Sequence, residues 1–189
     1  MPLGSARFGL LGGAGASGQL ELIETQTASA DSSIDFTSLG SYNVHFLTYT
    51  LTGSSADVGL FSRFSNDGGS SFRDSGYYYA QQRGDGEGGF SEYKSTSMWA
   101  MQICNLANVA TSGHSFSGYI YYYNLASSTK YSYQTNHSSY SDREAANTVA
   151  FNFGSGTSQV AETNDAFNIF PNTGNITGTA SLYGLAESS

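Results

Sequence analysis

Residues 42–51 read YNVHFLTYTL and form the longest run of strand-forming side chains in the sequence. Valine, threonine and the aromatic residues are enriched in β-strands because their side chains pack well on a pleated surface. Successive side chains of a strand point to opposite faces, and apolar side chains occur at both sets of positions in this run. We therefore predict a strand in the centre of a sheet.

Runs of the same kind lie on both sides of this segment. They are separated by Gly, Ser, Asn and Asp, which are the residues favoured in turns. No window of helical length shows a convincing 3.6-residue apolar period. Many short strands without helices indicate an all-β fold, either a β-sandwich or a small barrel. We expect further strands over residues 20–25, 34–36, 58–64, 76–82, 96–104, 116–124, 131–136, 148–153, 165–170 and 176–185.

The chain has 189 residues, which favours a single domain. Residues 1–18 differ from the rest because they are rich in glycine and almost uncharged. We therefore divide the chain into a glycine-rich N-terminal arm (1–18) and a β-sandwich domain (19–189). The arm is either a flexible leader or a peg that becomes ordered against a larger assembly. In the second interpretation its anchoring side chains are Arg7, Phe8, Leu10 and Leu11.

The charge balance excludes some classes of partner. Only 12% of the residues are charged, and 15 acidic residues stand against 7 scattered basic ones. Binding to nucleic acid draws on clustered Lys and Arg, so no nucleic-acid partner is expected. No apolar run approaches the ~20 residues of a spanning helix, so no membrane insertion is expected. Few charges are available to protect exposed sheet edges, which predicts a homo-oligomer, with a cyclic trimer preferred.

Side chains suited to catalysis do not form a recognisable constellation. Three histidines stand singly in the sequence and are interpreted as structural: His45, His114 and His137. Asp85 and Glu87 are close enough in sequence for an acid–base pair, but a glycine-rich segment holds carboxylates poorly. Cys104, the single cysteine, lies in apolar surroundings that predict a buried and inert thiol. We expect a protein that is not an enzyme and uses no metal or cofactor.

Two glycine-containing segments are predicted to leave the sheets. Residues 66–70, NDGGS, favour a turn, because they match only half of a calcium-binding loop and lack its later glutamate. Residues 67–94 are the best candidate for a long exposed loop. This segment contains Arg83-Gly84-Asp85, a tripeptide that animal integrins bind, but so short a match arises often by chance.

Clustered tyrosines are the most informative side chains for binding. Tyr77, Tyr78 and Tyr79 lie beside the predicted loop, and Tyr121 and Tyr123 share one face of a predicted strand. Tyr122 is expected to point to the opposite face. A tyrosine combines an apolar ring with a polar tip, which suits subunit interfaces and the stacking of carbohydrates. Cross-strand pairing within or between subunits and ligand binding therefore both remain open.

Three stretches make the chain resemble structural proteins of tailed bacteriophages. They are LELIETQTAS with IDFTSL (20–29 and 34–39), RFSNDGGSSF with DSGY (63–72 and 74–77), and GNITGTASLYGL (174–185). The resemblance spans nearly the whole chain. It implies a jelly-roll-like β-sandwich, commonly trimeric, that has no catalytic residues and is anchored to the particle by its N-terminus. It also implies a virion protein that assembles in the cytoplasm of the host bacterium.

The resemblance leaves two functions open. The chain is either a capsid decoration (cement) or head-fibre protein bound to phage capsid proteins, or a short tail-fibre module that contacts host surface glycans. A glycan-cleaving enzyme on the same sheet is a third, minor option, since a suitable acid pair is missing.

Deletion of residues 1–18 tests the peg interpretation. We expect the shortened chain to remain a folded, soluble oligomer that no longer attaches to particles, because the strands all lie after residue 18. Co-sedimentation of the purified variant with particles that lack the chain measures attachment. Attachment at the level of the full chain would contradict the interpretation.

Overall fold

The computed structural model describes residues 19–111, 113–142 and 148–186. All regular structure in these ranges is β-strand, which confirms the predicted all-β class. The predicted arm, with Arg7, Phe8, Leu10 and Leu11, lies outside the described residues. The strands are β1 (Leu20–Asp31), β2 (Ile34–Phe36), β3 (Val44–Gly53), β4 (Val58–Ser65), β5 (Tyr77–Asp85), β6 (Phe90–Met98), β7 (Met101–Ala107), β8 (Phe116–Tyr123), β9 (Tyr133–Ser141), β10 (Val149–Ser158), β11 (Ala166–Pro171) and β12 (Ile176–Leu185).

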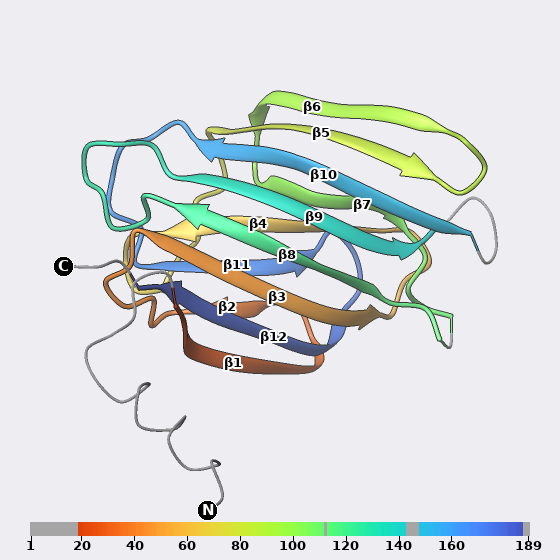
Figure 1. Cartoon of the computed structure of the whole chain (residues 1–189), viewed down its shortest axis with the longest axis horizontal. Helices are drawn as coiled ribbons and strands as arrows, with labels where there is room; N and C mark the ends of the chain where they lie inside the picture. The colour runs from red at the N-terminus through yellow and green to blue at the C-terminus, as the bar shows by residue number, and fades with distance from the viewer. Residues whose placement is uncertain (1–18, 112, 143–147, 187–189) are drawn as a thin grey trace, which may run out of the picture.

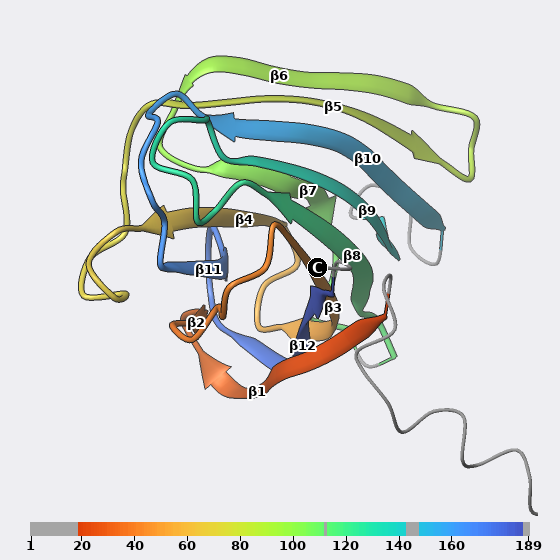
Figure 2. The ribbon, with the colours of Figure 1, turned by 60° about the vertical axis from the view of Figure 1, so that its left-hand side comes forward.

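These strands form an antiparallel β-sandwich of a large and a small sheet (Figure 1). The large sheet has eight strands in the order β1-β12-β3-β8-β9-β10-β5-β6, and the small sheet has four in the order β2-β11-β4-β7. The chain enters the small sheet at β2, β4, β7 and β11 and returns to the large sheet after each, which is the winding of a jelly roll. The large sheet bends around the small one (Figure 2).

The core fills the space between the small sheet and the inner face of the large sheet, the face that the small sheet covers. β3 lies between β12 and β8, so the prediction of a central strand over residues 42–51 is confirmed. Its inward side chains Leu47 and Leu51 are fully buried, whereas the outward Phe46 is half-buried. The apolar residues of β3 therefore face the core on one side of the sheet and the partly exposed outer face on the other.

Two buried tyrosines contribute both apolar area and hydrogen bonds to the core. The Tyr122 ring centroid lies 4.4 Å from that of Phe167, and the Tyr122 hydroxyl is 3.0 Å from Ser62 Oγ. The backbone NH of Phe64 donates to the Tyr77 hydroxyl oxygen at 2.7 Å. A buried tyrosine hydroxyl without a partner would lose its hydration without compensation. Tyr122 points away from the exposed face of β8, as predicted from the alternation.

The β7 edge of the small sheet is closed by side chains of the large sheet. β7 is the last strand of the small sheet and packs against β5, β9 and β10. The carbonyl oxygen of Gln102 accepts hydrogen bonds from the side-chain amides of Gln81 and Gln134. Asn136 Nδ2 donates to the carbonyl oxygen of Ile103 at 2.8 Å. These contacts, which we call the amide seam, satisfy backbone groups that an uncovered edge would leave to water or to another chain.

Two predictions about residues 67–104 are wrong. The expected long loop contains the hairpin of β5 and β6, because the glycine-rich residues 86–89 form a tight turn in which Gly88 has φ of 91°. The strand predicted over residues 96–104 is broken between Met98 and Met101, where the chain passes from the large to the small sheet. Trp99 at this crossing stacks on Phe61 of the small sheet, with ring centroids 4.9 Å apart. Tertiary packing here overrides a continuous strand-forming pattern.

Among the described residues, the structure contains no helix of the length and apolar character that crossing a membrane requires.

Replacement of Asn136 by alanine tests the amide seam. We expect the free energy of unfolding to fall by about 1–3 kcal/mol, because the buried Ile103 carbonyl loses its closest side-chain donor. Urea denaturation followed by circular dichroism measures the change. Ser139→Ala, on the exposed face of the same strand, is the control and should stay within about 0.5 kcal/mol of wild type. Equal stability of the two variants would contradict the role of the seam.

Candidate binding surface on the outer face of the large sheet

The outer face of the large sheet, opposite to the small sheet, carries an unusual set of side chains. On β8 the inward residues Ile120 and Tyr122 are buried, so Tyr119, Tyr121 and Tyr123 point outward. The register extends this set across neighbouring strands, since directly paired residues share a face. One such row runs from β12 to β6 through Tyr183, Phe46, Tyr121, Thr135, Ser155, Ala80 and Lys94.

The aromatic rings of this face touch one another across strands. The ring centroids of Phe46 and Tyr121 are 4.7 Å apart, and those of Tyr119 and His137 are 5.7 Å apart. From His137 the contacts continue at 6.3 Å to Phe151, which stacks on Phe153 at 6.2 Å. Aromatic pairs at such distances attract each other beyond the area that they bury. We call the band of outward rings on β12, β3, β8, β9, β10, β5 and β6 the aromatic face.

Large apolar side chains on this face remain open to solvent. The most exposed aromatic rings are Phe90 (69%), Phe153 (47%), Tyr133 (43%), Tyr119 (40%) and Tyr78 (38%). Monomeric soluble proteins rarely expose contiguous apolar patches of more than a few hundred Å², and larger patches mark interaction sites. The aromatic face is therefore the leading candidate for a binding surface.

The aromatic face is almost free of charge. Among the outward residues of the described parts of β12, β3, β8, β9, β10, β5 and β6, the charged ones are Glu92 and Lys94 on the edge strand β6. Their side chains form an exposed ion pair, with Glu92 Oε2 3.5 Å from Lys94 Nζ. Threonine and serine occupy many of the other outward positions, so hydroxyl groups supply most of the polarity there. The face suits an uncharged partner.

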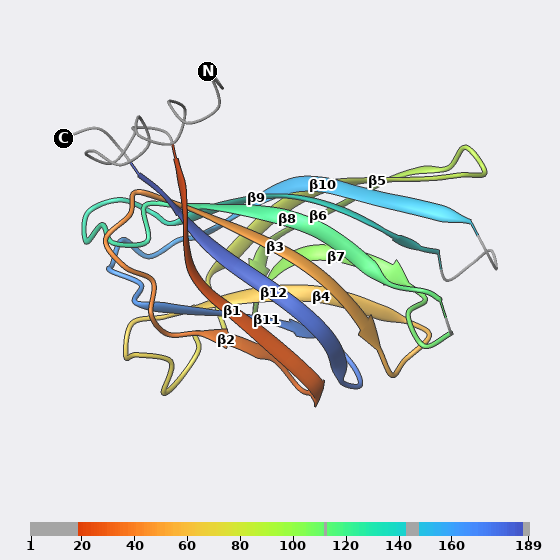
Figure 3. The same ribbon diagram turned by 60° about the horizontal axis from the view of Figure 1, so that its bottom comes forward.

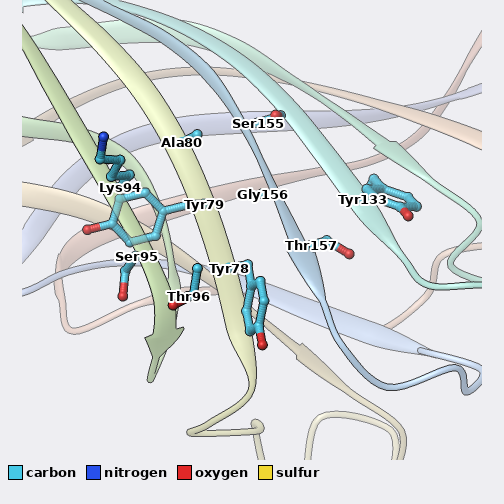
Figure 4. Close-up of a pocket in the computed structure, with 10 residues that line it drawn as sticks. All are labelled: Tyr78, Tyr79, Ala80, Lys94, Ser95, Thr96, Tyr133, Ser155, Gly156 and Thr157. Atoms are coloured by element: carbon cyan, nitrogen blue, oxygen red, sulfur yellow. The ribbon is translucent and has the colours of Figure 1, made fainter.

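Three connected depressions divide the aromatic face. The first, of about 600 Å³, lies over β10 between Tyr78 on β5 and Tyr133 on β9 (Figure 4). A second, of about 710 Å³, shares Ser155 with it and reaches the tyrosines of β8. A third, of about 300 Å³, shares Ala80 and Lys94 with the first. Small residues, among them Ala80 and Ser155, line the bottom of these depressions. A large side chain at either of these positions would fill the depression.

The structure separates the five tyrosines that the sequence singled out. Tyr78, Tyr121 and Tyr123 point outward on the aromatic face, and Tyr78 borders the first depression. Tyr79 lies at an inward position of β5, is half-buried and borders the same depression. Tyr77 is not a surface residue, which corrects the prediction. It is fully buried, and burial raises the pKa of its hydroxyl to about 12.

Sequence reasoning did not identify the contribution of β10. Phe153 and Ser155 point outward opposite His137 and Thr135 of β9, and Phe153 is 47% exposed. A signal was present, because Val149, Phe151 and Phe153 alternate with smaller residues in the predicted strand over 148–153. That alternation did not show which of the two sets would face the solvent.

The three histidines lie in different environments. His45 is buried and its Nε2–H donates to the Leu39 carbonyl oxygen at 2.8 Å, while burial lowers its pKa. His114 Nδ1 lies 3.2 Å from the Asn108 carbonyl oxygen. His137 contacts the rings of Tyr119 and Phe151 on the aromatic face. None of these contacts joins a histidine to another candidate catalytic side chain.

The tripeptide Arg83-Gly84-Asp85 is not presented in a loop, contrary to the prediction of an exposed segment. Arg83 lies on the inner face, is 3% exposed, and forms an ion pair with Asp142. Asp85 Oδ1 accepts hydrogen bonds from the backbone NH groups of Gly89 at 2.9 Å and Glu87 at 3.0 Å, and the first of these contributes most to the lowered pKa of its carboxyl group. Both charges thus stabilise the β5–β6 hairpin and its contact with the end of β9.

Residues 66–70 form a turn, as predicted. Gly68 and Gly69 have φ of 71° and 84°, values that favour glycine. Asp67 accepts hydrogen bonds from the Ser71 hydroxyl at 2.6 Å, the Ser71 NH at 2.9 Å and the Ser65 hydroxyl at 2.7 Å, which lower its pKa to about 2. In the described ranges no three His, Cys, Asp or Glu side chains are grouped so as to hold a metal ion.

Comparison with known proteins adds no relative to this description. The sequence matches no protein-family model and no curated protein sequence. The three stretches on which the expected likeness to phage structural proteins rests include parts of β1, β2, β4 and β12 and the turn at 66–70.

Cys104 is expected to be unreactive in the folded protein. It is fully buried, and burial raises the pKa of its thiol to about 12, so the reactive thiolate is scarce at neutral pH. A chromogenic disulfide reagent at pH 8 should modify less than about 5% of the thiol in buffer and all of it in denaturant. Rapid modification of the native protein would contradict the burial.

Proposed function

We propose that the chain is a non-enzymatic structural protein of a bacteriophage virion, a trimeric capsid decoration (cement) or head-fibre protein attached by residues 1–18. The proposal starts from the three stretches that resemble phage structural proteins. The observation that carries it is the exposed and nearly uncharged aromatic face on a two-sheet body. Exposing such an apolar face to water is energetically unfavourable. Its presence therefore indicates a protein whose role is to contact other molecules.

The position of β1 supports attachment at one end of the body. Leu20 at the start of β1 pairs with Leu185 at the end of β12, at the edge of the large sheet (Figure 3). A segment that precedes β1 therefore joins the body at this end. Leu20 is 45% and Leu22 60% exposed, so apolar surface continues from the edge of the sheet toward that end. An anchor there leaves the broad outer face accessible to neighbouring copies or to the host.

The alternative is a short tail-fibre or receptor-binding module that contacts host surface glycans. The connected depressions between Tyr78, Tyr133 and the tyrosines of β8 favour it. Concave sites lined by aromatic and hydroxyl-bearing side chains are typical of small-ligand binding. In this form of the proposal the particle carries few copies of the chain, because tails have far fewer attachment points than capsids.

Counting copies per particle tests the proposal and separates its two forms. We expect the chain in purified particles of the phage that encodes it, and its ratio to the major capsid protein should correspond to one trimer per lattice position. Quantitative mass spectrometry with isotope-labelled peptides measures this ratio. A ratio equivalent to a few copies favours the tail module, and the absence of the chain from washed particles contradicts both forms.

A further inference from the structure

We infer that the depression between Tyr78 and Tyr133 binds an uncharged oligosaccharide, with its sugar rings stacked on the aromatic side chains. The inference rests on the second form of the proposed function, the contact with host glycans, and assigns the contact to a site. Its central residues are Tyr78, Tyr133, Ser155 and Thr157, on β5, β9 and β10. Three properties of this site carry the inference: its shape, the chemistry of its lining and its charge.

The shape fits an extended chain better than a flat surface. The first depression measures about 600 Å³, within the range of roughly 300–1,000 Å³ typical of small-ligand sites. It continues past Ala80 into the third depression and past Ser155 into the second, and Phe153 borders both of these. A flat partner lying on the raised rings would leave these spaces unfilled, whereas specific protein interfaces are packed as densely as protein interiors.

The lining combines the two kinds of group that a sugar requires. A pyranose ring has an apolar face of C–H groups and an edge of hydroxyl groups. The rings of Tyr78 and Tyr133 stand on either side of β10 and are 38% and 43% exposed, so each has surface to offer to the apolar face. Ser155 and Thr157 lie between them, and each hydroxyl donates one hydrogen bond and accepts two. Tyrosine and serine together make adaptable contacts at low entropic cost.

The charge disfavours anionic ligands. Lys94, the basic side chain at the site, is 3.5 Å from Glu92 and forms an ion pair with it. The chain as a whole has a formal charge of −8, which repels phosphorylated or carboxylated polymers. Binding to such polymers depends on clustered Lys and Arg. An uncharged sugar chain has no such requirement.

A second copy of the chain is the competing occupant of this face. Stacked rings also occur where subunits meet, and the proposed trimer needs an interface somewhere. The depressions argue against this face, because two copies would have to project complementary ridges into them. Several outward residues of β9 and β10 beside the depressions are instead short hydroxyl side chains, namely Thr135, Ser155 and Thr157.

The test uses the full-length purified protein on a microarray of neutral and acidic bacterial oligosaccharides and polysaccharides. We expect binding to neutral glycans, and isothermal titration calorimetry with the strongest neutral oligosaccharide then gives Kd. Tyr133→Ala and Tyr78→Ala should each raise Kd about tenfold or more, the effect of removing one buried aromatic anchor. Tyr133→Phe keeps the ring and should change Kd less than about threefold.

Tyr131→Ala is the matched control. Tyr131 is 40% exposed, similar to Tyr133, but it precedes β9 and does not line the depressions, so Kd should be unchanged. Light scattering after size-exclusion chromatography establishes that each variant is folded and keeps its oligomeric state. Dissociation of the oligomer by Tyr133→Ala would show that the face joins copies of the chain and would overturn the inference.

Other results would also overturn it: binding to no glycan, binding to anionic glycans alone, or an unchanged Kd in both alanine variants. The measurement is independent of virions. A chain that binds neutral glycans through Tyr78 and Tyr133 but is absent from particles would contradict the proposed function alone. A chain that decorates particles but binds no glycan would contradict this inference alone.

Discussion

The rest of the structure depends on how the backbone groups at the β7 edge of the small sheet find hydrogen-bond partners. β7 has a partner strand on one side only, and its carbonyl groups at Gln102 and Ile103 are buried under the large sheet. Amide side chains from β5 and β9 supply the missing donors. Leaving such groups unpaired costs more than a typical hydrogen bond contributes, so the amide seam strongly favours a single alignment of the two sheets. Close approach is possible because β10 has glycine at 156, where a Cβ atom would lie 2.9 Å from Met101 Cγ.

The same alignment determines the composition of the aromatic face. A strand that shifts by one residue turns its entire inward set outward. Because Gln81, Gln134 and Asn136 must face β7, their neighbours Tyr133 and Thr135 on β9 and Ala80 on β5 must face the solvent. The buried polar contacts on one side of the sheet therefore hold the exposed rings and hydroxyl groups on the other side in register. A binding surface built in this way is rigid, and it loses little conformational entropy when a ligand binds.

In the proposed function, attachment to the particle and contact with glycans use different parts of the molecule. The proposal assigns attachment to the segment before β1, at one edge of the large sheet, and contact with glycans to β9, β10 and β5, toward the other edge. Several titratable groups with a lowered or raised pKa serve the fold: Asp67 and Asp85 accept hydrogen bonds in turns, and Tyr77, Tyr122 and Cys104 are buried in the core.

The sequence by itself determined the all-β class, most strand positions, the turn at 66–70 and the opposite orientations of Tyr121 and Tyr122. These features follow from alternation and turn chemistry, which act between residues close in the chain. Only the tertiary structure decided that Tyr77 is buried while Tyr78 is exposed, that β6 and β7 are separate strands, and that Thr157 pairs with both Tyr78 and Tyr133. Alternation distinguishes two faces of a strand, but which face is covered depends on strands far away in the sequence.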